Sequence, residues 1–322
     1  MHAVIESTDN QFHHYWNKLV KSDPLQNPLY APALPQSEYA DLSPERFRDH
    51  SFMVVSEHEP VFGCSLTSTT DANGMRRLGF YGREASTLVN RNQMGIPSNN
   101  FEPEAVELLL DHFTRLMQDI SPDVLEYLDP VSCGLMSPLT QVLLEKGAQP
   151  QVYNSQVIRL GLSERALLAC VDDLYRNQIR WGIEHIALEV VSGDLIANHG
   201  DALDALCTAY SATTEYSKEF YRSCERLIQA RQGFLIQSGL QTGDRALFVH
   251  NNHTCHLVVA DVPGQTDSLP VLPTMLWQAI RFSKQQKCSY FDLGGKIVQP
   301  ACVDLKKFGG AASTRIRVRY SQ

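Results

Sequence analysis

The sequence has no Cys-x-x-Cys pair, no long apolar run and no surplus of positive charge. Its eight cysteines lie far apart and away from histidines at zinc-finger spacing, which argues against a zinc site. No apolar stretch approaches the roughly 20 residues that a membrane-spanning helix needs. The net charge of −8 argues against a general surface for nucleic acids or anionic membranes, but not against a local basic cleft. We therefore expect no metal and no membrane span.

The amino-terminal residues also lack the basic flank and apolar core that are typical of a signal peptide. We therefore expect a cytoplasmic protein whose cysteines are reduced thiols that mostly fill small buried spaces. A hydrophobic content of 43% and a charged content of 20% are typical of a soluble globular protein. A chain of 322 residues is long enough for two domains, each with its own core.

The first half of the chain, residues 1–155, is predicted to form one domain. Hydrophobic patterns of helical and strand period, separated by turn residues, define its elements. The Asp9 side chain is expected to cap the first helix. The predicted strands are 2–6, 51–57, 61–70, 76–81, 124–128 and 151–160, and the later helices are 104–120 and 138–146.

The second half, residues 156–322, is predicted to form the other domain. Ser163 is expected to cap a helical stretch that runs to about residue 185, with a break near Asp172. The other predicted helices are 201–210, 218–232 and 273–287, and the strands are 188–192, 233–240, 245–251, 254–262, 290–293 and 314–320.

The two halves repeat one order of elements: a helix, three antiparallel strands, a helix, a strand, a variable segment and a final strand. A helix that follows an antiparallel meander and returns the chain to a parallel neighbour gives a mixed sheet flanked by helices. The order therefore predicts the α/β (α+β) class, with two tandem domains that each contain a mixed, mainly antiparallel sheet. One option is that the last strand packs back on the first domain.

Residues 288–310 contain a short apolar strand followed by a glycine pair, a polar loop, two adjacent lysines and a second glycine pair. Glycines let the backbone approach a ligand closely or adopt positive φ. Lysines beside such a turn can hold an anion. The alternative is an ordinary β-turn with solvated lysines.

Three segments, together with the repeated order, resemble the FemAB family of aminoacyltransferases that build peptidoglycan bridges. This family has a tandem form of the GCN5-related N-acetyltransferase (GNAT) fold. The segments are Arg-Asn-Gln-Ile at 176–179, Leu-Trp-Gln-Ala-Ile at 276–280, and Asp-Leu-Gly-Gly at 292–295 with Lys-Lys-Phe-Gly-Gly at 306–310. The first half resembles the family only in its order of elements. The resemblance implies transfer of an acyl or aminoacyl group to an amine.

Two features depart from this family and from simple acetyltransferases. The family usually has one or two residues between its lysine and its aromatic residue, so either Lys306 or Lys307 could be the counterpart. The loop that cradles coenzyme A pyrophosphate in simple acetyltransferases is replaced by Pro-Gly-Gln-Thr-Asp-Ser at 263–268. This segment could still offer backbone N–H groups to a phosphate at the start of the next helix. FemAB enzymes also lack the cradle, which favours that branch.

Acyl transfer to an amine requires a neutral amine, a polarised carbonyl and a protonated leaving group. Asp292 is a candidate catalytic base or a group that orients the amine. Alternatively, it is a turn aspartate that accepts from the Gly294 and Gly295 amides. His256 alternates with apolar residues and is a candidate catalytic acid or base, or else a half-buried structural histidine. Backbone N–H groups at a β-bulge could hold the carbonyl.

The lysines near the second glycine pair are further candidates. Lys306 is a candidate catalytic residue that would stabilise the leaving group or a phosphate, and Lys307 is a candidate substrate-binding residue. The alternative is an exposed basic pair. Tyr290 and Lys296 lie on either side of Asp292 and are also candidate substrate-binding residues.

Other candidate substrate-binding residues lie earlier in the second half. Arg176 and Arg180 lie one helical turn apart on one face, where they could bind a diphosphate. A solvated helix face is the alternative. Tyr216, Tyr221 and Arg222 lie in the variable segment, where they could line the acceptor site.

The leading hypothesis from these observations is an N-acyltransferase. The acyl group would come from a thioester such as acyl-coenzyme A, or from aminoacyl-tRNA, and the acceptor would be the amine of an amino-sugar or another cell-envelope precursor. The acidic net charge and the lack of a coiled-coil arm make tRNA a weaker candidate donor. The competing hypothesis is a non-catalytic protein that keeps the fold to bind a nucleotide, lipid or peptide.

Overall fold

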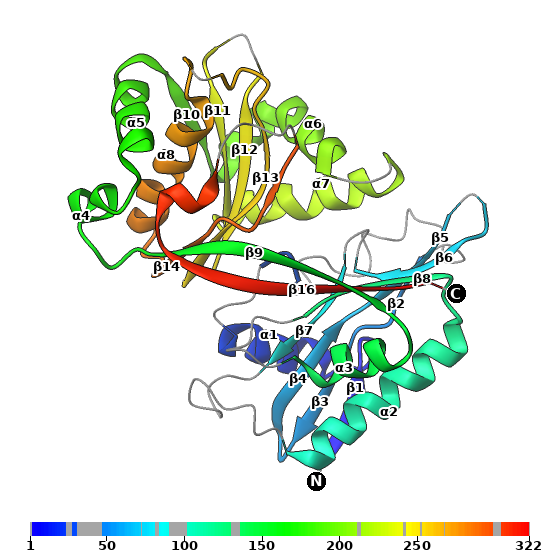
Figure 1. The fold of residues 1–322 in the computed structure, drawn as a ribbon. Helices are drawn as coiled ribbons and strands as arrows, with labels where there is room; N and C mark the ends of the chain where they lie inside the picture. Colours follow the sequence, from blue (N-terminus) through cyan, green and yellow to red (C-terminus); the bar gives the residue numbers. More distant parts are fainter. Residues whose placement is uncertain are drawn as a thin grey trace. The chain divides into compact units, whose positions relative to one another are not determined.

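The computed structural model describes residues 2–23, 28–30, 47–71, 73–80, 84–89, 102–129, 136–210, 214–240, 243–251, 253–266, 268–298 and 304–321. The chain divides into two compact units (Figure 1). Unit 1 comprises Met1–Gln26, Tyr30–Tyr153 and Arg315–Gln322, and unit 2 comprises Asn27–Leu29 and Asn154–Thr314.

Unit 1 is built on a sheet in which the strands follow the order β1-β3-β4-β7-β8-β16. A side group, β2-β5-β6, joins this sheet through the pairing of β6 with β8. The strands are β1 (His2–Glu6), β2 (Phe47–Asp49), β3 (Phe52–Ser56), β4 (Glu59–Ser65), β5 (Thr67–Thr70), β6 (Arg76–Gly79), β7 (Ala85–Val89), β8 (Val124–Leu128) and β16 (Ala311–Ser321). The helices are α1 (Phe12–Ser22), α2 (Pro103–Ile120) and α3 (Pro138–Glu145), and a 3₁₀ turn covers Pro28–Tyr30.

Helices cover both faces of the unit 1 sheet. The apolar side chains of β3 alternate between the two faces. Phe52 and Val54 pack in a cluster with residues of α2 and α3. Met53 and Val55 pack with Phe12, Trp16 and Leu19 of α1 on the other face. This explains why β3 reads as a continuous apolar run rather than as an alternating one.

Unit 2 repeats this plan with the strand order β9-β14-β13-β12-β11-β10. The helices are α4 (Glu164–Ala169), α5 (Asp173–His185), α6 (Gly200–Tyr210), α7 (Thr214–Gln229) and α8 (Val271–Gln285), with 3₁₀ segments η3 (Gly193–His199) and η4 (Leu305–Phe308). The strands are β9 (Gln149–Arg159), β10 (Leu188–Val191), β11 (Gly233–Ser238), β12 (Arg245–His250), β13 (Thr254–Asp261), β14 (Tyr290–Asp292) and β15 (Lys296–Ile297).

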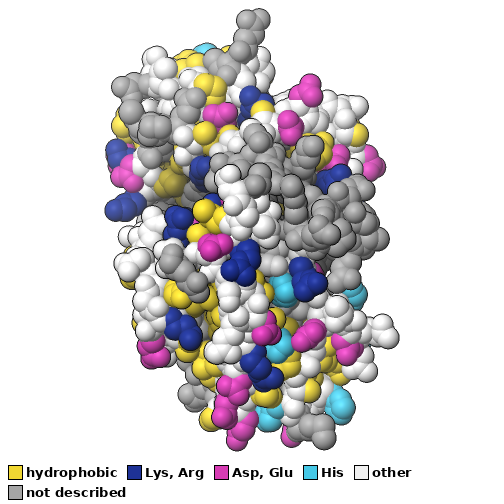
Figure 2. Space-filling view, turned by 90° about the vertical axis from the view of Figure 1, so that its right-hand side faces the viewer, with side chains coloured by type: hydrophobic (Ala, Val, Ile, Leu, Met, Phe, Trp, Pro, Cys, Tyr) yellow, Lys and Arg dark blue, Asp and Glu magenta, His cyan; other side chains and the backbone are white. Residues whose placement is uncertain are grey.

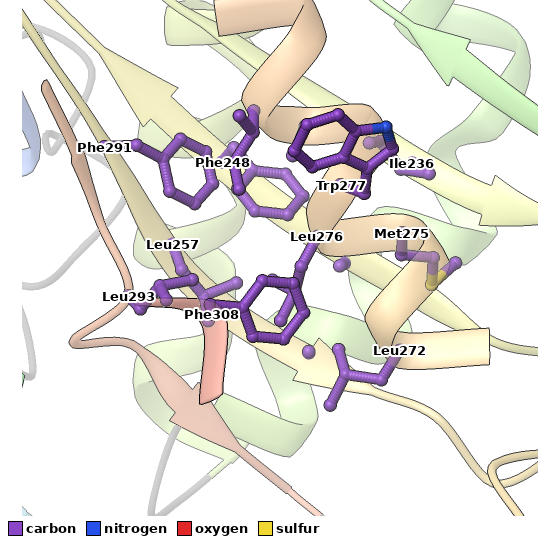
Figure 3. Packing of buried hydrophobic residues seen from close by; sticks show 14 of the residues in the cluster. Ile236, Phe248, Leu257, Leu272, Met275, Leu276, Trp277, Phe291, Leu293 and Phe308 are labelled. Atoms are coloured by element: carbon purple, nitrogen blue, oxygen red, sulfur yellow. The ribbon is translucent and has the colours of Figure 1, made fainter. Parts of the chain in front are cut away.

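The core of unit 2 lies between its sheet and helices α5 and α8. Figure 3 shows Leu276 and Trp277 of α8 against side chains from β11, β12 and β13, and Phe308 of η4 in the same cluster. Helices α6 and α7 contact the strands β11, β12 and β13, and in Figure 1 they lie on the face of the sheet away from α5 and α8. The sheet of unit 2 is therefore covered on both faces.

These elements confirm the expected fold class, in which mixed and mainly antiparallel sheets are flanked by helices. The parallel pairs are β7 with β8, β6 with β8, and β13 with both β14 and β15. The expected break in the helical stretch after Ser163 is also confirmed. The Ser163 side chain accepts from the Ala166 amide at the start of α4, and Asp172 caps α5.

Several expected elements were wrong in detail. The strand expected at 61–70 is two strands, because β4 pairs with β3 and β7 whereas β5 pairs with β2 and β6. The Ser51 hydroxyl accepts the Leu66 amide between them. The strands β2, β7 and β15 were not expected. Asp9 does not cap α1 directly; its carboxylate accepts the Gln11 amide in the turn before the helix.

The described residues contain no helix that is both long and apolar enough to cross a membrane. Six cysteines lie within the described ranges as free thiols; Cys170 is exposed and the other five are buried. This burial confirms the expectation that most cysteines fill small spaces, although Cys133 and Cys302 lie outside the described residues.

Candidate active site

The parallel pair of strands β13 and β14 places His256 and Asp292 directly opposite each other. The neighbours of His256 in β13, Cys255 and Leu257, belong to the core cluster formed with α5 and α8. Because side chains alternate along a strand, His256 and Asp292 point to the opposite face of the sheet, which α6 and α7 cover. The structure therefore brings together two of the three predicted catalytic residues.

The His256–Asp292 pair is buried, with each side chain 5% exposed. Nδ1 of His256 lies 3.4 Å from Oδ2 of Asp292. The other carboxylate oxygen, Oδ1, accepts the Gly294 amide at 2.9 Å and also accepts the Ser155 hydroxyl. Asp292 therefore makes the turn contact with Gly294 and the contact with histidine at once, so the two interpretations of this residue do not exclude each other.

The second ring nitrogen of His256, Nε2, is buried and has no hydrogen-bond partner among the described residues. A buried polar atom without a partner is costly in a folded protein, and in a functional site it commonly awaits a ligand. An imidazole that is held at Nδ1 by a carboxylate and open at Nε2 is arranged to accept a proton at Nε2.

The backbone next to this pair is irregular. In β13 the residue Val258 has no partner in β12, because Leu257 pairs with Phe248 and Val259 pairs with Leu247. On its other edge, β13 pairs with β14 up to His256 and with β15 from Val259 onward. A bulge of this kind interrupts the ladder and redirects backbone groups.

Glycine is required where the chain passes from β14 to β15. A Cβ atom on Gly295 would lie 2.4 Å from the carbonyl oxygen of Leu257, which is closer than any side chain allows. The backbone of this turn thus lies directly against the bulge in β13. The glycine pair at 294–295 permits close approach of another strand, and neither glycine adopts positive φ.

The two lysines of η4 lie against the start of α5. The backbone carbonyl of Lys307 accepts the Asp172 amide at 2.8 Å, and its ammonium group lies 5.4 Å from the ring centroid of Tyr175. The Lys306 side chain is exposed. No contact that the structure gives for these lysines reaches His256 or Asp292.

The helix α5 positions the two predicted arginines. Nη2 of Arg176 donates to the carbonyls of Ala169 and Val171 and lies 2.9 Å from Asp173, so it ties the end of α4 to the start of α5. Arg180 is exposed one turn further along the helix. The guanidinium of Arg176 thus already has three oxygen partners within the chain.

The remaining predicted substrate-binding residues lie apart from one another. The Tyr290 ring packs on the His253 ring at 5.0 Å. Nζ of Lys296 donates to the last two carbonyls of α6, at Ala209 and Tyr210.

In α7, burial raises the pKa of Tyr221, and Glu225 adds to this shift. Arg222 is partly buried in the same helix. Tyr216 belongs to the same helix, but its side chain lies outside the described residues.

The sequence left open that the start of α8 offers backbone N–H groups to a phosphate, but the described N–H groups there already have partners. The Leu272 amide donates to the side-chain oxygen of Gln265 at 2.9 Å. The Val271 and Thr274 amides donate to the carbonyls of Leu269 and Pro270, and residue 273 is a proline without an N–H group. The helix start is therefore satisfied by its own chain.

The loop that leads into α8 is closed in the same way. The Gly264 amide donates to the buried Asp244 carboxylate at 2.7 Å, and Gln265 and Thr266 donate to backbone carbonyls within the loop. A carboxylate already occupies the position of an anion there. The described residues of this loop, 263–266, thus leave no free group for a coenzyme A diphosphate at the start of α8.

Sequence reasoning missed two residues of this region, Ser155 and Gln265. Ser155 is one polar residue in a strand of mixed character, and Gln265 lies in a loop of turn residues. No local pattern marks either side chain, because their roles depend on partners that only the fold brings near.

Unit 1 has a separate surface depression of about 440 Å³, lined by Val4, Glu6, Thr8, Asp9 and His112. It contains none of the predicted site residues. Within the described ranges, no group of histidine, cysteine, aspartate and glutamate side chains is arranged to hold a metal ion.

Comparisons with known proteins show the fold rather than a family. No family model matches the sequence, and no curated protein is similar to it in sequence. A structure of FemX is 12% identical and covers 99% of this chain and 97% of its own, with a TM-score of 0.66. A tandem GNAT protein from the clavulanic acid biosynthesis pathway is 10% identical, covers 100% and 98%, and has a TM-score of 0.56.

A conserved protein of unknown function from Bacteroides thetaiotaomicron is similar to the same degree, with 10% identity, coverage of 99% and 100%, and a TM-score of 0.55. All three matches extend over nearly the whole chain, so they include both units. The protein therefore has a FemAB-like tandem GNAT fold.

Proposed function

We propose that this protein is an N-acyltransferase and that unit 2 carries its active site. The observation that supports this most directly is the buried His256, whose Nδ1 faces Asp292 and whose Nε2 has no partner among the described residues. An amine must lose a proton to attack an acyl carbon, and the open Nε2 is placed to take it. The tandem GNAT fold supports acyl transfer as the reaction class.

In this proposal Asp292 orients His256 and stabilises its charged form. The carboxylate would hold the tautomer with hydrogen on Nδ1 and leave Nε2 as the acceptor. The 3.4 Å contact is longer than a strong hydrogen bond. Such contacts commonly tighten once substrate is bound, and an imidazolium would also draw the carboxylate closer.

The acyl carbonyl would be polarised by the backbone at the bulge in β13. Val258 has no partner in β12, and it lies two residues from His256 on the same strand. An acyl carbonyl bound there would lie close to His256, the proposed base. Backbone N–H groups that are already oriented stabilise a developing oxyanion without further reorganisation.

The donor in this proposal is an activated acyl group, either a thioester such as acyl-coenzyme A or an aminoacyl ester of tRNA. The closed start of α8 bears on how a thioester would bind. Because Leu272 is paired with Gln265, and Gly264 with Asp244, a coenzyme A diphosphate would need other partners than in simple acetyltransferases. Lys306 and Lys307 in η4 are candidates for that role or for the leaving group.

The acceptor would be an amine on an amino-sugar or another cell-envelope precursor, as the FemAB resemblance implies. The amine would approach Nε2 of His256 on the face of the sheet where α6 and α7 lie. Tyr221 and Arg222 of α7 would then contribute to the acceptor side of the site. The reaction would take place inside the cell, on a soluble or membrane-linked precursor.

The test measures donor consumption with acyl-coenzyme A thioesters and aminoacyl-tRNA, each combined with nucleotide-linked amino-sugars. For a pair that reacts, His256→Asn should lower kcat/KM by roughly 10²–10⁴-fold, the usual contribution of a general base. His253→Asn, which alters a histidine of the adjacent turn, is the control and should stay near wild type. A His256→Asn variant with full activity would refute the assignment, and no turnover with any pair would favour the non-catalytic binding protein.

A further inference from the structure

The carboxylate that faces His256 is itself held by a serine from another part of the chain. We propose that Ser155 of β9 is a positioning residue for the transfer reaction, because it fixes Asp292 so that one carboxylate oxygen stays directed at His256. The role of Ser155 in catalysis rests on the proposed function. The contacts of Ser155 are observed in the fold and do not depend on that function.

The two oxygens of Asp292 have different partners. Oδ1 accepts the Ser155 hydroxyl and the Gly294 amide, the latter at 2.9 Å. Oδ2 faces Nδ1 of His256 at 3.4 Å. Two donors on one oxygen hold the plane of the carboxylate, and the second oxygen is thereby directed toward the histidine.

The backbone holds Ser155 in this position. Asp292 pairs with Val157 of β9 in an antiparallel ladder, and the Leu293 amide donates to the Gln156 carbonyl at 2.9 Å. Ser155 therefore lies two residues beyond the partner of Asp292, on the same face of the sheet. The hydroxyl does not depend on a flexible loop to reach the carboxylate.

The Gly294 position is fitted to the same arrangement. A Cβ atom on Gly294 would lie 2.9 Å from the Ser155 hydroxyl oxygen and 3.0 Å from Oδ1 of Asp292. Only glycine lets the turn bring its amide onto the carboxylate while the serine occupies the other side. The turn and the serine thus form one holder for Asp292.

Burial makes the serine matter for charge as well as for orientation. Ser155 is 2% exposed and Asp292 is 3% exposed, so little water competes for the carboxylate. Donors to an ionised carboxylate favour its unprotonated form. Removing the serine donor should therefore free the carboxylate to turn and leave its charge less stabilised.

Among the described residues, the titratable groups near the pair are either neutral or bound to other partners. The Cys255 thiol lies next to His256 on β13 and is affected by the Asp292 charge, but burial raises its pKa well above the ordinary value, so it stays neutral. Cys288 in turn acts on Cys255, and burial raises its own pKa to about 11. The Lys296 ammonium on β15 donates to the carbonyls that end α6.

The experiment reads the tautomer of His256 from the nitrogen-15 signals of its imidazole by NMR on the full chain. In Ser155→Ala the preference for hydrogen on Nδ1 should weaken, because the freed carboxylate no longer keeps one oxygen directed at that nitrogen. Gly294→Ala, which displaces the same carboxylate, should also weaken this preference. Ser22→Ala is the matched control, because its buried hydroxyl donates to the Leu19 carbonyl in α1 of unit 1.

An unchanged tautomer preference of His256 in Ser155→Ala would overturn the inference, whether or not the protein transfers acyl groups. A weaker preference in Ser155→Ala, with no change in Ser22→Ala, would support it. Where a donor and acceptor pair reacts, kcat/KM should fall in the Ser155→Ala variant. The proposed function fails separately, through an active His256→Asn variant.

Discussion

His50 in unit 1 lies where the fold opposes its protonation. Its Nε2 is 2.9 Å from the Ser68 hydroxyl oxygen. Burial, with a smaller effect from Arg48, lowers its pKa from 6.5 to about 4. The unfolded chain therefore binds a proton on His50 at a pH where the folded chain does not, and the folded state loses stability through this group as the pH falls.

We expect the urea midpoint of the wild type to fall through His50 as the pH drops from about 6.5 toward 4, the interval between the unfolded and folded pKa values. His50→Gln keeps a polar group near Ser68 but cannot take up the proton. As the pH falls through this interval, the urea midpoint of His50→Gln should therefore rise relative to that of the wild type. His14→Gln, at an exposed position of α1, is the control. Parallel curves for wild type and His50→Gln would contradict the assignment.

The candidate site shows which single residues a sequence can reveal. His256 and Asp292 were named because one alternates with apolar residues and the other ends a strand before a glycine pair. Strand register then explains their meeting, since the two residues are direct partners. Ser155 could not be named, because its partner lies 137 residues away and its own strand shows no polar pattern. Its role exists only in the folded sheet.

At the scale of elements, the described backbone N–H groups at the start of α8 already have partners within the chain. The Leu272 amide is held by Gln265, and the Gly264 amide by the Asp244 carboxylate. A phosphate would have to displace one side chain and approach another that is negatively charged. The sequence revealed the missing cradle, but the two side chains that replace it depend on loop geometry that local patterns do not specify.

The expected consequence concerns donor recognition. If a thioester reacts, acyl-pantetheine, which lacks the nucleotide diphosphate, should match acyl-coenzyme A in kcat/KM to within about threefold, since fewer than ~0.7 kcal/mol would come from the missing part. Steady-state kinetics with both donors measures this. A preference of more than about tenfold for acyl-coenzyme A would show that the diphosphate is recognised elsewhere on the chain. Free coenzyme A should likewise cause little thermal shift.

The helices α5 and α8 approach each other closely at one glycine. A Cβ atom on Gly182 would lie 1.9 Å from the Thr274 hydroxyl oxygen and 2.9 Å from its Cβ, so the helices would have to separate. We expect Gly182→Ala to lower the free energy of unfolding by about 1–3 kcal/mol. Gly161→Ala is the matched control, because no atom lies within 4 Å of its added Cβ. Equal urea midpoints for the two variants would mean that α5 moves freely.

Most elements followed from hydrophobic period, and the failures have local causes. The breaks between helices α4 and α5 were predictable, since Ser163 and Asp172 are both capping residues. The strand expected at 61–70 failed because Thr67 and its neighbours leave the main sheet to pair with β2 and β6. The threonines after Leu66 favour a strand as the apolar residues before it do, so composition does not mark the change of partner. Short strands such as β15 are set by their partner, β13, rather than by their own two residues.

At the scale of the molecule, the chain carries a net charge of −8. Figure 2 shows one face, on which acidic and basic side chains are interspersed rather than gathered into a patch of one sign. With a net charge of −8, the chain has no overall attraction for polyanions. Recognition of an anionic donor would therefore depend on individual groups such as the η4 lysines. Raising the salt concentration should weaken it modestly, because few charges would be neutralised.

The two units are not consecutive along the chain, since the carboxyl-terminal residues Arg315–Gln322 belong to unit 1. There β16 pairs with β8, and Val318 lies opposite Tyr127. Val318 is 1% exposed and belongs to the cluster that α2 and α3 cover. We propose that each unit is a separate folding domain and that the first domain depends on the last strand of the chain for its core.

Val318→Ala tests this dependence. The loss of two buried methyl groups should destabilise unit 1 by about 1–3 kcal/mol through lost contacts and a small cavity. Native-state hydrogen exchange should then show faster exchange of the β8 amides, while β12 and β13 in unit 2 keep their protection. Arg319→Ala alters an exposed neighbour on the same strand and should leave both units unchanged. If β12 and β13 lost protection together with β8, the two units would unfold as one cooperative domain, since a cavity in one separate domain leaves the other's opening free energy untouched.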